Sequence, residues 1–106
     1  MSGIISFSEK PEEIWIINNV NFRGTLNALA ERMPSVPDVK DALWGAEGIS
    51  ALMLEKMDPK LARTFIEGLR RLTRDVAAGL VPELAAVTTH IDELAAILTH
   101  VESRYT

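Results

Sequence analysis

The fold is decided most clearly by residues 82–105, which read PELAAVTTHIDELAAILTHVESRY. Apolar residues recur here at alternating spacings of three and four, which is typical of a helix with one apolar seam. The seam consists of Leu84, Val87, Ile91, Leu94, Leu98, Val101 and Tyr105. Alanine and threonine dominate the other faces and leave room for neighbouring helices. We therefore expect a helix over 82–104, placed centrally in a bundle or in a dimer.

A second helix is predicted just before this one, over 59–79. Asp58 is a good N-cap, and Pro59 suits the first helical position. The apolar positions that follow fall on one stripe, formed by Leu61, Phe65, Leu69, Leu72 and Val76. Gly79 and Pro82 end the pattern.

The middle of the chain predicts a helix over 37–57, which starts at Pro37 with acidic residues in its first turn. Its apolar stripe consists of Val39, Leu43, Ala46, Ile49, Met53 and Met57. Gly45 and Gly48 interrupt the pattern, and each lowers helix stability by about 1 kcal/mol relative to alanine. Either they permit a close helix crossing beside Trp44, or the helix divides there.

The N-terminal third leaves several structures open. Residues 22–33 predict a helix that ends at Pro34. Residues 3–7 and 13–20 are rich in β-branched and aromatic side chains, so a hairpin turning at 9–12 is one alternative. Because Pro11 also suits a first helical turn, a helix or an extended arm are the others. Residues 1–21 are thus a segment of open structure.

These elements predict one all-α domain over 1–106, in which 22–104 form a compact antiparallel bundle of three to four helices. The chain is 47% hydrophobic, a large share for 106 residues, and some of that surface is expected to lie against another chain. We expect a homodimer through the last helix, with an interface of Leu84, Val87, Ile91, Leu94, Leu98 and Val101. No signal peptide or membrane span is recognisable, so a cytoplasmic location is expected.

Charge is distributed unevenly along the chain. Residues 59–78 carry five basic and two acidic side chains, whereas 79–106 carry one basic and four acidic ones. Arg63, Arg70 and Arg74 fall on one face of the predicted 59–79 helix and, with Arg71 beside them, form a basic stripe. The stripe is either a docking site for an acidic partner or a solvated face paired with the last helix. The net charge of −4 disfavours nucleic acid as the target.

The residues that could carry chemistry form no recognisable catalytic or metal-binding pattern. The chain has no cysteine, which excludes disulfides and thiolate zinc sites. His90 and Glu93 lie three apart on the last helix, but His100 is about 15 Å along the axis from His90. One chain therefore cannot bring both histidines to one ion, and a metal would need ligands from two chains. We predict no cofactor and no catalytic residue.

Trp44 is the remaining candidate, because tryptophan is over-represented at the centres of protein interfaces. With the arginine stripe, it makes the predicted partner-binding set. The sequence therefore predicts a small non-enzymatic protein-interaction module: an adaptor, an inhibitor or immunity-type protein, or a small subunit of a larger assembly. The alternative is a metal- or cofactor-dependent enzyme subunit whose site is shared between chains.

Overall fold

The first eighteen residues form a β-hairpin, one of the alternatives that the sequence leaves open. The structure, a computed structural model, describes residues 1–105. Strands β1 (Ser2–Ser6) and β2 (Ile14–Asn18) pair antiparallel around the short 3₁₀ turn η1 (Pro11–Glu13). The later elements are α1 (Asn19–Ala30), α2 (Pro37–Ile49), β3 (Ala51–Met53), η2 (Leu54–Lys56), α3 (Pro59–Ala77), η3 (Pro82–Val87), α4 (Thr88–Val101) and η4 (Glu102–Tyr105).

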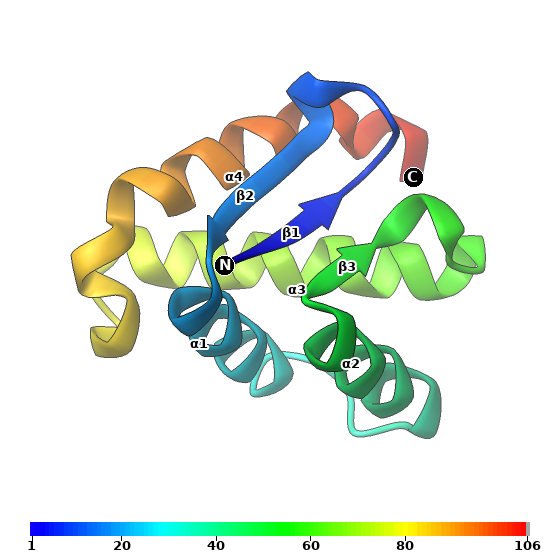
Figure 1. Ribbon diagram of the computed structural model, residues 1–106, viewed down its shortest axis with the longest axis horizontal. Helices are drawn as coiled ribbons and strands as arrows, with labels where there is room; N and C mark the ends of the chain where they lie inside the picture. The colour runs from blue at the N-terminus through cyan, green and yellow to red at the C-terminus, as the bar shows by residue number, and fades with distance from the viewer. Residues whose placement is uncertain (106) are drawn as a thin grey trace.

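A three-stranded sheet corrects the predicted all-α class. Strand β3 pairs parallel to β1, so the strand order is β2-β1-β3. Helices still account for 70% of the chain and strands for 12%. The protein is therefore a mostly helical α+β fold, with α3 and α4 crossing behind the sheet in Figure 1. None of the helices among residues 1–105 is long and apolar enough to cross a bilayer.

The predicted helix over 37–57 is wrong beyond Ile49. Ser50 adopts a left-handed conformation with φ 55°, which ends α2 and turns the chain into β3. Leu52 is then buried against the hairpin, and Ile4 donates its backbone N–H to the Ser50 carbonyl at 3.0 Å. Pairing with β1 thus overrides the local helical pattern over 51–53.

The other helical predictions hold approximately. The helix expected over 22–33 is α1, which starts three residues earlier because the Asn18 side chain accepts a hydrogen bond from the Asn21 N–H. The helix expected over 59–79 is α3, capped by Asp58 as predicted. The last predicted helix is helical throughout 82–105, but its two ends are the 3₁₀ segments η3 and η4.

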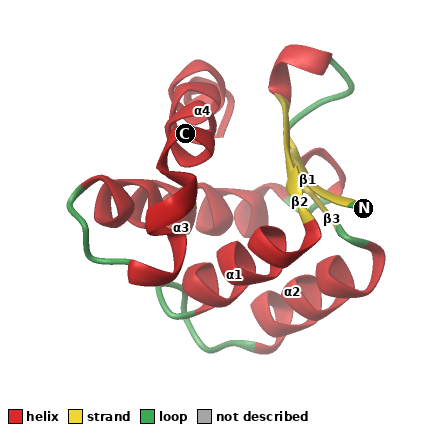
Figure 2. Cartoon of the chain, turned by 60° about the vertical axis from the view of Figure 1, so that its left-hand side comes forward, coloured by secondary structure: helices red, strands yellow, loops and turns green. Residues whose placement is uncertain are grey.

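The core lies between one face of the sheet and the helices. The buried sheet face carries Gly3, Ile5, Trp15, Ile17 and Leu52, and Figure 2 shows α3 and α4 on that side. A Cβ on Gly3 would lie 2.1 Å from Cγ of Phe22, so the ring of α1 packs directly on the β1 backbone. Trp15 donates from Nε1 to the His90 carbonyl at 2.7 Å, which fixes β2 on α4.

Candidate functional site

The six seam residues proposed as an oligomer interface lie in the core of the single chain. Leu84, Val87, Ile91, Leu94, Leu98 and Val101 are all between 0% and 9% exposed. Helices α1 and α3 and the sheet cover them, so this seam leaves no surface for a second copy. The correction has a simple reason: a spacing of three and four shows that a helix face is buried, but not which chain buries it.

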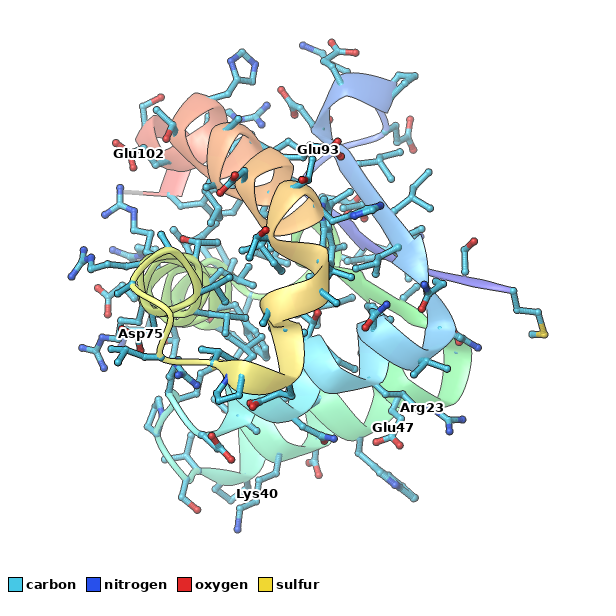
Figure 3. The ribbon with its side chains drawn as sticks, turned by 90° about the vertical axis from the view of Figure 1, so that its left-hand side faces the viewer. Arg23, Lys40, Glu47, Asp75, Glu93 and Glu102 are labelled. Atoms are coloured by element: carbon cyan, nitrogen blue, oxygen red, sulfur yellow. The ribbon has the colours of Figure 1, made fainter. Side chains whose placement is uncertain are left out.

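Trp44 lies outside that core and is 81% exposed. It sits on α2, whose inner face packs through Val39 and Ala46. Residues four apart share a helix face, so Lys40, Trp44 and Gly48 follow one another along the outer side. Lys40 and Glu47, labelled in Figure 3, lie along the same outer side of α2. Among the exposed residues of α2, only Trp44 and the terminal Ile49 are large and apolar, and the others are small or charged.

The two glycines beside Trp44 have no role in packing the chain itself. A Cβ built on Gly45 or on Gly48 would meet nothing within 4 Å. Of the two alternatives that the sequence leaves open, the close helix crossing is absent among residues 1–105, and α2 continues through both glycines to Ile49. By contrast, Gly68 of α3 faces the side chain of Met33, with a Cβ distance of only 2.7 Å. Gly45 and Gly48 form, with Trp44 and Glu47, a shallow open hollow.

The outer face of α2 is also acidic. Asp38, Asp41 and Glu47 are exposed on this helix, against a single exposed cation, Lys40. We call the outer surface of α2, formed by Lys40, Asp41, Trp44, Gly45, Glu47 and Gly48, the Trp44 face. Its chemistry is an aromatic anchor on a flat backbone surface, flanked by carboxylates.

The arginine stripe is divided in the structure. Arg70 is half-buried and forms an ion pair with Glu102 of η4, as expected if the stripe pairs with the end of the chain. Arg63, Arg71 and Arg74 are exposed on α3. Arg74 lines a groove between α3 and α4 together with Asp92. The stripe is thus partly a pairing surface within the chain and partly free for solvent or a partner.

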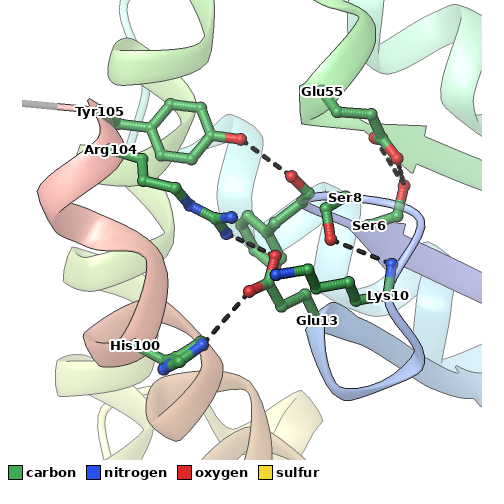
Figure 4. A network of polar contacts seen from close by, with 9 residues as sticks. Ser6, Ser8, Lys10, Glu13, Glu55, His100, Arg104 and Tyr105 are labelled. Carbon is green, nitrogen blue, oxygen red and sulfur yellow. Dashed lines mark hydrogen bonds and ion pairs between the residues drawn. The ribbon is translucent and has the colours of Figure 1, made fainter.

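A buried carboxylate that the sequence does not reveal lies at the hairpin turn. The Glu13 side chain is 2% exposed and accepts a hydrogen bond from Nη2 of Arg104, while Nε2 of His100 lies 3.2 Å from its Oε2 (Figure 4). Hydrogen bonds from Ser8 and then from Arg104 lower the pKa of Glu13 from 4.5 to about 2, against the effect of burial. The carboxylate therefore stays charged and ties η4 to the hairpin.

A second polar contact lies beside this cluster. Ser6 donates to both carboxylate oxygens of Glu55, at 2.8 and 3.0 Å, and the Tyr105 hydroxyl donates to the Phe7 carbonyl at 3.2 Å. Burial raises the pKa of the Tyr105 hydroxyl. These groups border an open hollow of about 440 Å³ whose lining includes Phe7, Leu54, Met57, Arg63, Arg104 and Tyr105.

The two histidines stand apart, as their spacing predicts. His100 contacts Glu13, whereas His90 is exposed and contributes its carbonyl to Trp15. Within residues 1–105, no three His, Asp or Glu side chains lie close enough together to hold a metal ion.

The fold and its surfaces define a small α+β protein with an exposed aromatic face on one helix. Comparison with known proteins adds no family to this description: no family model, no curated protein and no solved structure matches the chain.

Proposed function

We propose that this protein is a small non-enzymatic interaction module that docks a protein partner on the Trp44 face. The observation that carries the proposal is the exposed Trp44 beside two glycines that pack against nothing. Each glycine lowers the stability of α2 by about 1 kcal/mol relative to alanine. No contact within the described chain compensates for this loss, so a contact with another molecule is the explanation we favour.

The geometry of the face indicates how a partner would bind. A tryptophan supplies a large contact area with few rotatable bonds, and such residues dominate binding energy at many interfaces. Without Cβ atoms at Gly45 and Gly48, the backbone of a partner can approach the axis of α2 closely. The partner would therefore receive the indole in an apolar pocket and lay its own chain across the glycines.

The charges on the face narrow the kind of partner. Asp41 and Glu47 flank Trp44, so basic side chains around the receiving pocket would complement them. Charges at the rim of an interface act mainly on the association rate and on specificity. An adaptor, an inhibitor or a subunit of an assembly would each use such a surface.

Site-specific photo-crosslinking in the native host tests the location of the docking surface. A benzoylphenylalanine at position 40 replaces Lys40 next to Trp44, and the control places it at position 71 in the arginine stripe. A discrete crosslinked protein from position 40, absent from position 71, is the expected result. Crosslinking from position 71 alone would instead assign docking to Arg63, Arg71 and Arg74 and contradict the proposal.

A further inference from the structure

Strand β2 is an edge of the sheet with hydrogen-bonding groups that face outward. Two bonds at the ends of the hairpin, Phe7 N–H to Glu13 O at 3.0 Å and Asn19 N–H to Met1 O at 3.1 Å, fix the alternation. Odd-numbered residues of β2 therefore bond to β1, since alternate residues of an antiparallel pair point to opposite edges. The N–H and C=O of Ile16 consequently point away from the sheet.

This edge lacks the features that usually keep sheet edges apart. Proteins protect an edge strand with a charged side chain, a proline, a bulge or a very short strand. The sequence of β2, IWIIN, contains no charge and no proline, and its register with β1 runs without a bulge. The opposite edge, β3, has only three residues. The β2 edge is thus the one suited to pairing.

The outer face of the sheet carries an apolar row across its middle, where a solvated face would be polar. Ile16 is 57% exposed and stands opposite Ile4, which in turn stands opposite Ala51. These three residues form a row that runs across all three strands. The row ends at the β2 edge with Ile16. The apolar surface therefore lies directly beside the outward-facing backbone N–H and C=O of Ile16.

We infer that a second copy of this chain pairs with β2, antiparallel and about a twofold axis through Ile16. Each Ile16 then donates its N–H to the Ile16 carbonyl of the other copy and accepts the reciprocal bond. The Asn18 N–H and the Ile14 C=O, which face the same edge, supply two further bonds by the same symmetry. The result is a six-stranded sheet, in which the two apolar rows join through the Ile16 side chains.

The charges at the two ends of β2 are complementary under this twofold. Glu12 precedes the strand and is exposed, while Arg23 follows it on the first turns of α1 and is also exposed. Figure 3 shows acidic Glu93 of α4 toward one end of β2 and Arg23 of α1 toward the other. Antiparallel pairing brings the acidic end of each copy to the basic end of the other.

Sedimentation velocity over roughly a hundredfold range of concentration tests the pairing by mass action. The wild type should form a dimer, and Ile16→Lys should raise the dimer dissociation constant on the order of a hundredfold, because two like charges meet at the axis. Leu80→Lys is the matched control, since Leu80 is 65% exposed and lies outside the sheet; it should leave the dimer unchanged. A wild type that stays monomeric throughout, or an Ile16→Lys variant that dimerises normally, would overturn the inference.

Two measurements separate strand pairing from any other dimer. Hydrogen exchange of the Ile16 and Asn18 amides should slow as the protein concentration rises, whereas amides that already bond to β1 should not respond. Arg23→Glu alone should weaken the dimer, and adding Glu12→Arg should restore it. A dimer whose Ile16 amide exchanges at a rate independent of concentration would contradict pairing through β2.

Discussion

The Arg104 guanidinium donates a hydrogen bond to the buried Glu13 carboxylate and so joins two residues that are 91 positions apart. This contact holds η4, the last 3₁₀ segment, against the N-terminal hairpin. His100 approaches the same carboxylate from α4. The cluster is the main polar anchor between the termini of the described chain.

The Glu13 cluster, formed by Glu13, His100 and Arg104, predicts that the stability of the fold falls at acidic pH. Since the pKa of Glu13 is lowered from 4.5 to about 2 in the fold, its stabilisation is complete above pH 4.5 and is lost as the pH falls toward 2. Glu13→Gln should therefore lower the free energy of unfolding at neutral pH and flatten its decline over that window. Denaturant titrations at several pH values measure this, with the exposed neighbour Glu12→Gln as control. If the free energy of unfolding of wild type and of Glu13→Gln declined in parallel below pH 4.5, the role of the cluster would be contradicted.

The divided arginine stripe predicts unequal effects of charge reversal. Arg70→Glu places a carboxylate beside Glu102, so it should lower the free energy of unfolding by up to about 1 kcal/mol, a typical value for a half-exposed pair. Arg71→Glu, on the exposed side of the same helix, should leave stability nearly unchanged. Thermal unfolding of both variants checks the difference. Equal destabilisation would mean that the Arg70–Glu102 pair has no specific effect.

The burial of the α4 seam predicts that its residues stabilise the monomer. Leu94 is 0% exposed, so Leu94→Ala should lower the free energy of unfolding by about 2–5 kcal/mol. The loss should be the same at low and high protein concentration, because the cavity forms within one chain. If Leu94→Ala lowered the free energy of unfolding only at concentrations where the protein associates, Leu94 would lie in the interface that the sequence predicts.

The helix positions could be read from the sequence where local signals were strong. Asp58 caps α3 through a hydrogen bond to the Lys60 N–H, and the apolar stripe that follows is buried as its spacing predicts. Such signals depend on residues within one or two turns of each other. The helices that they predict therefore form in the same place, however the distant parts of the chain pack.

Other features depend on contacts between distant segments, which no local pattern encodes. Strand β3 has three residues, and its Leu52 and Met53 also suit a helix; only pairing with β1 makes it a strand. Ser50 turns the chain at a positive φ without the glycine that would have marked the turn. The residue type alone makes Trp44 a candidate for partner binding. Its exposure, and the absence of packing contacts at Gly45 and Gly48, can be seen only in the structure.

The open surroundings of the α2 glycines predict that they can be replaced without loss of stability. Gly45→Ala and Gly48→Ala should each raise the free energy of unfolding by about 0.5–1 kcal/mol, because the added methyl meets nothing and the helix gains propensity. Gly3→Ala is the contrasting control and should destabilise, since its methyl would overlap the Phe22 ring. Chemical denaturation measures all three. Destabilisation by Gly48→Ala would show that the fold itself needs this glycine.

Quantitative affinity capture from the native host tests whether Trp44 anchors a protein partner. Wild type, Trp44→Ala and Leu80→Ala are compared as baits, because Leu80 is another large apolar side chain that is mostly exposed. We expect a captured protein that wild type and Leu80→Ala retain equally. Trp44→Ala should bind it about thirtyfold more weakly or not at all, because losing an interface anchor lowers the binding free energy by about 2 kcal/mol. Equal retention of every captured protein by Trp44→Ala would show that Trp44 does not anchor a partner.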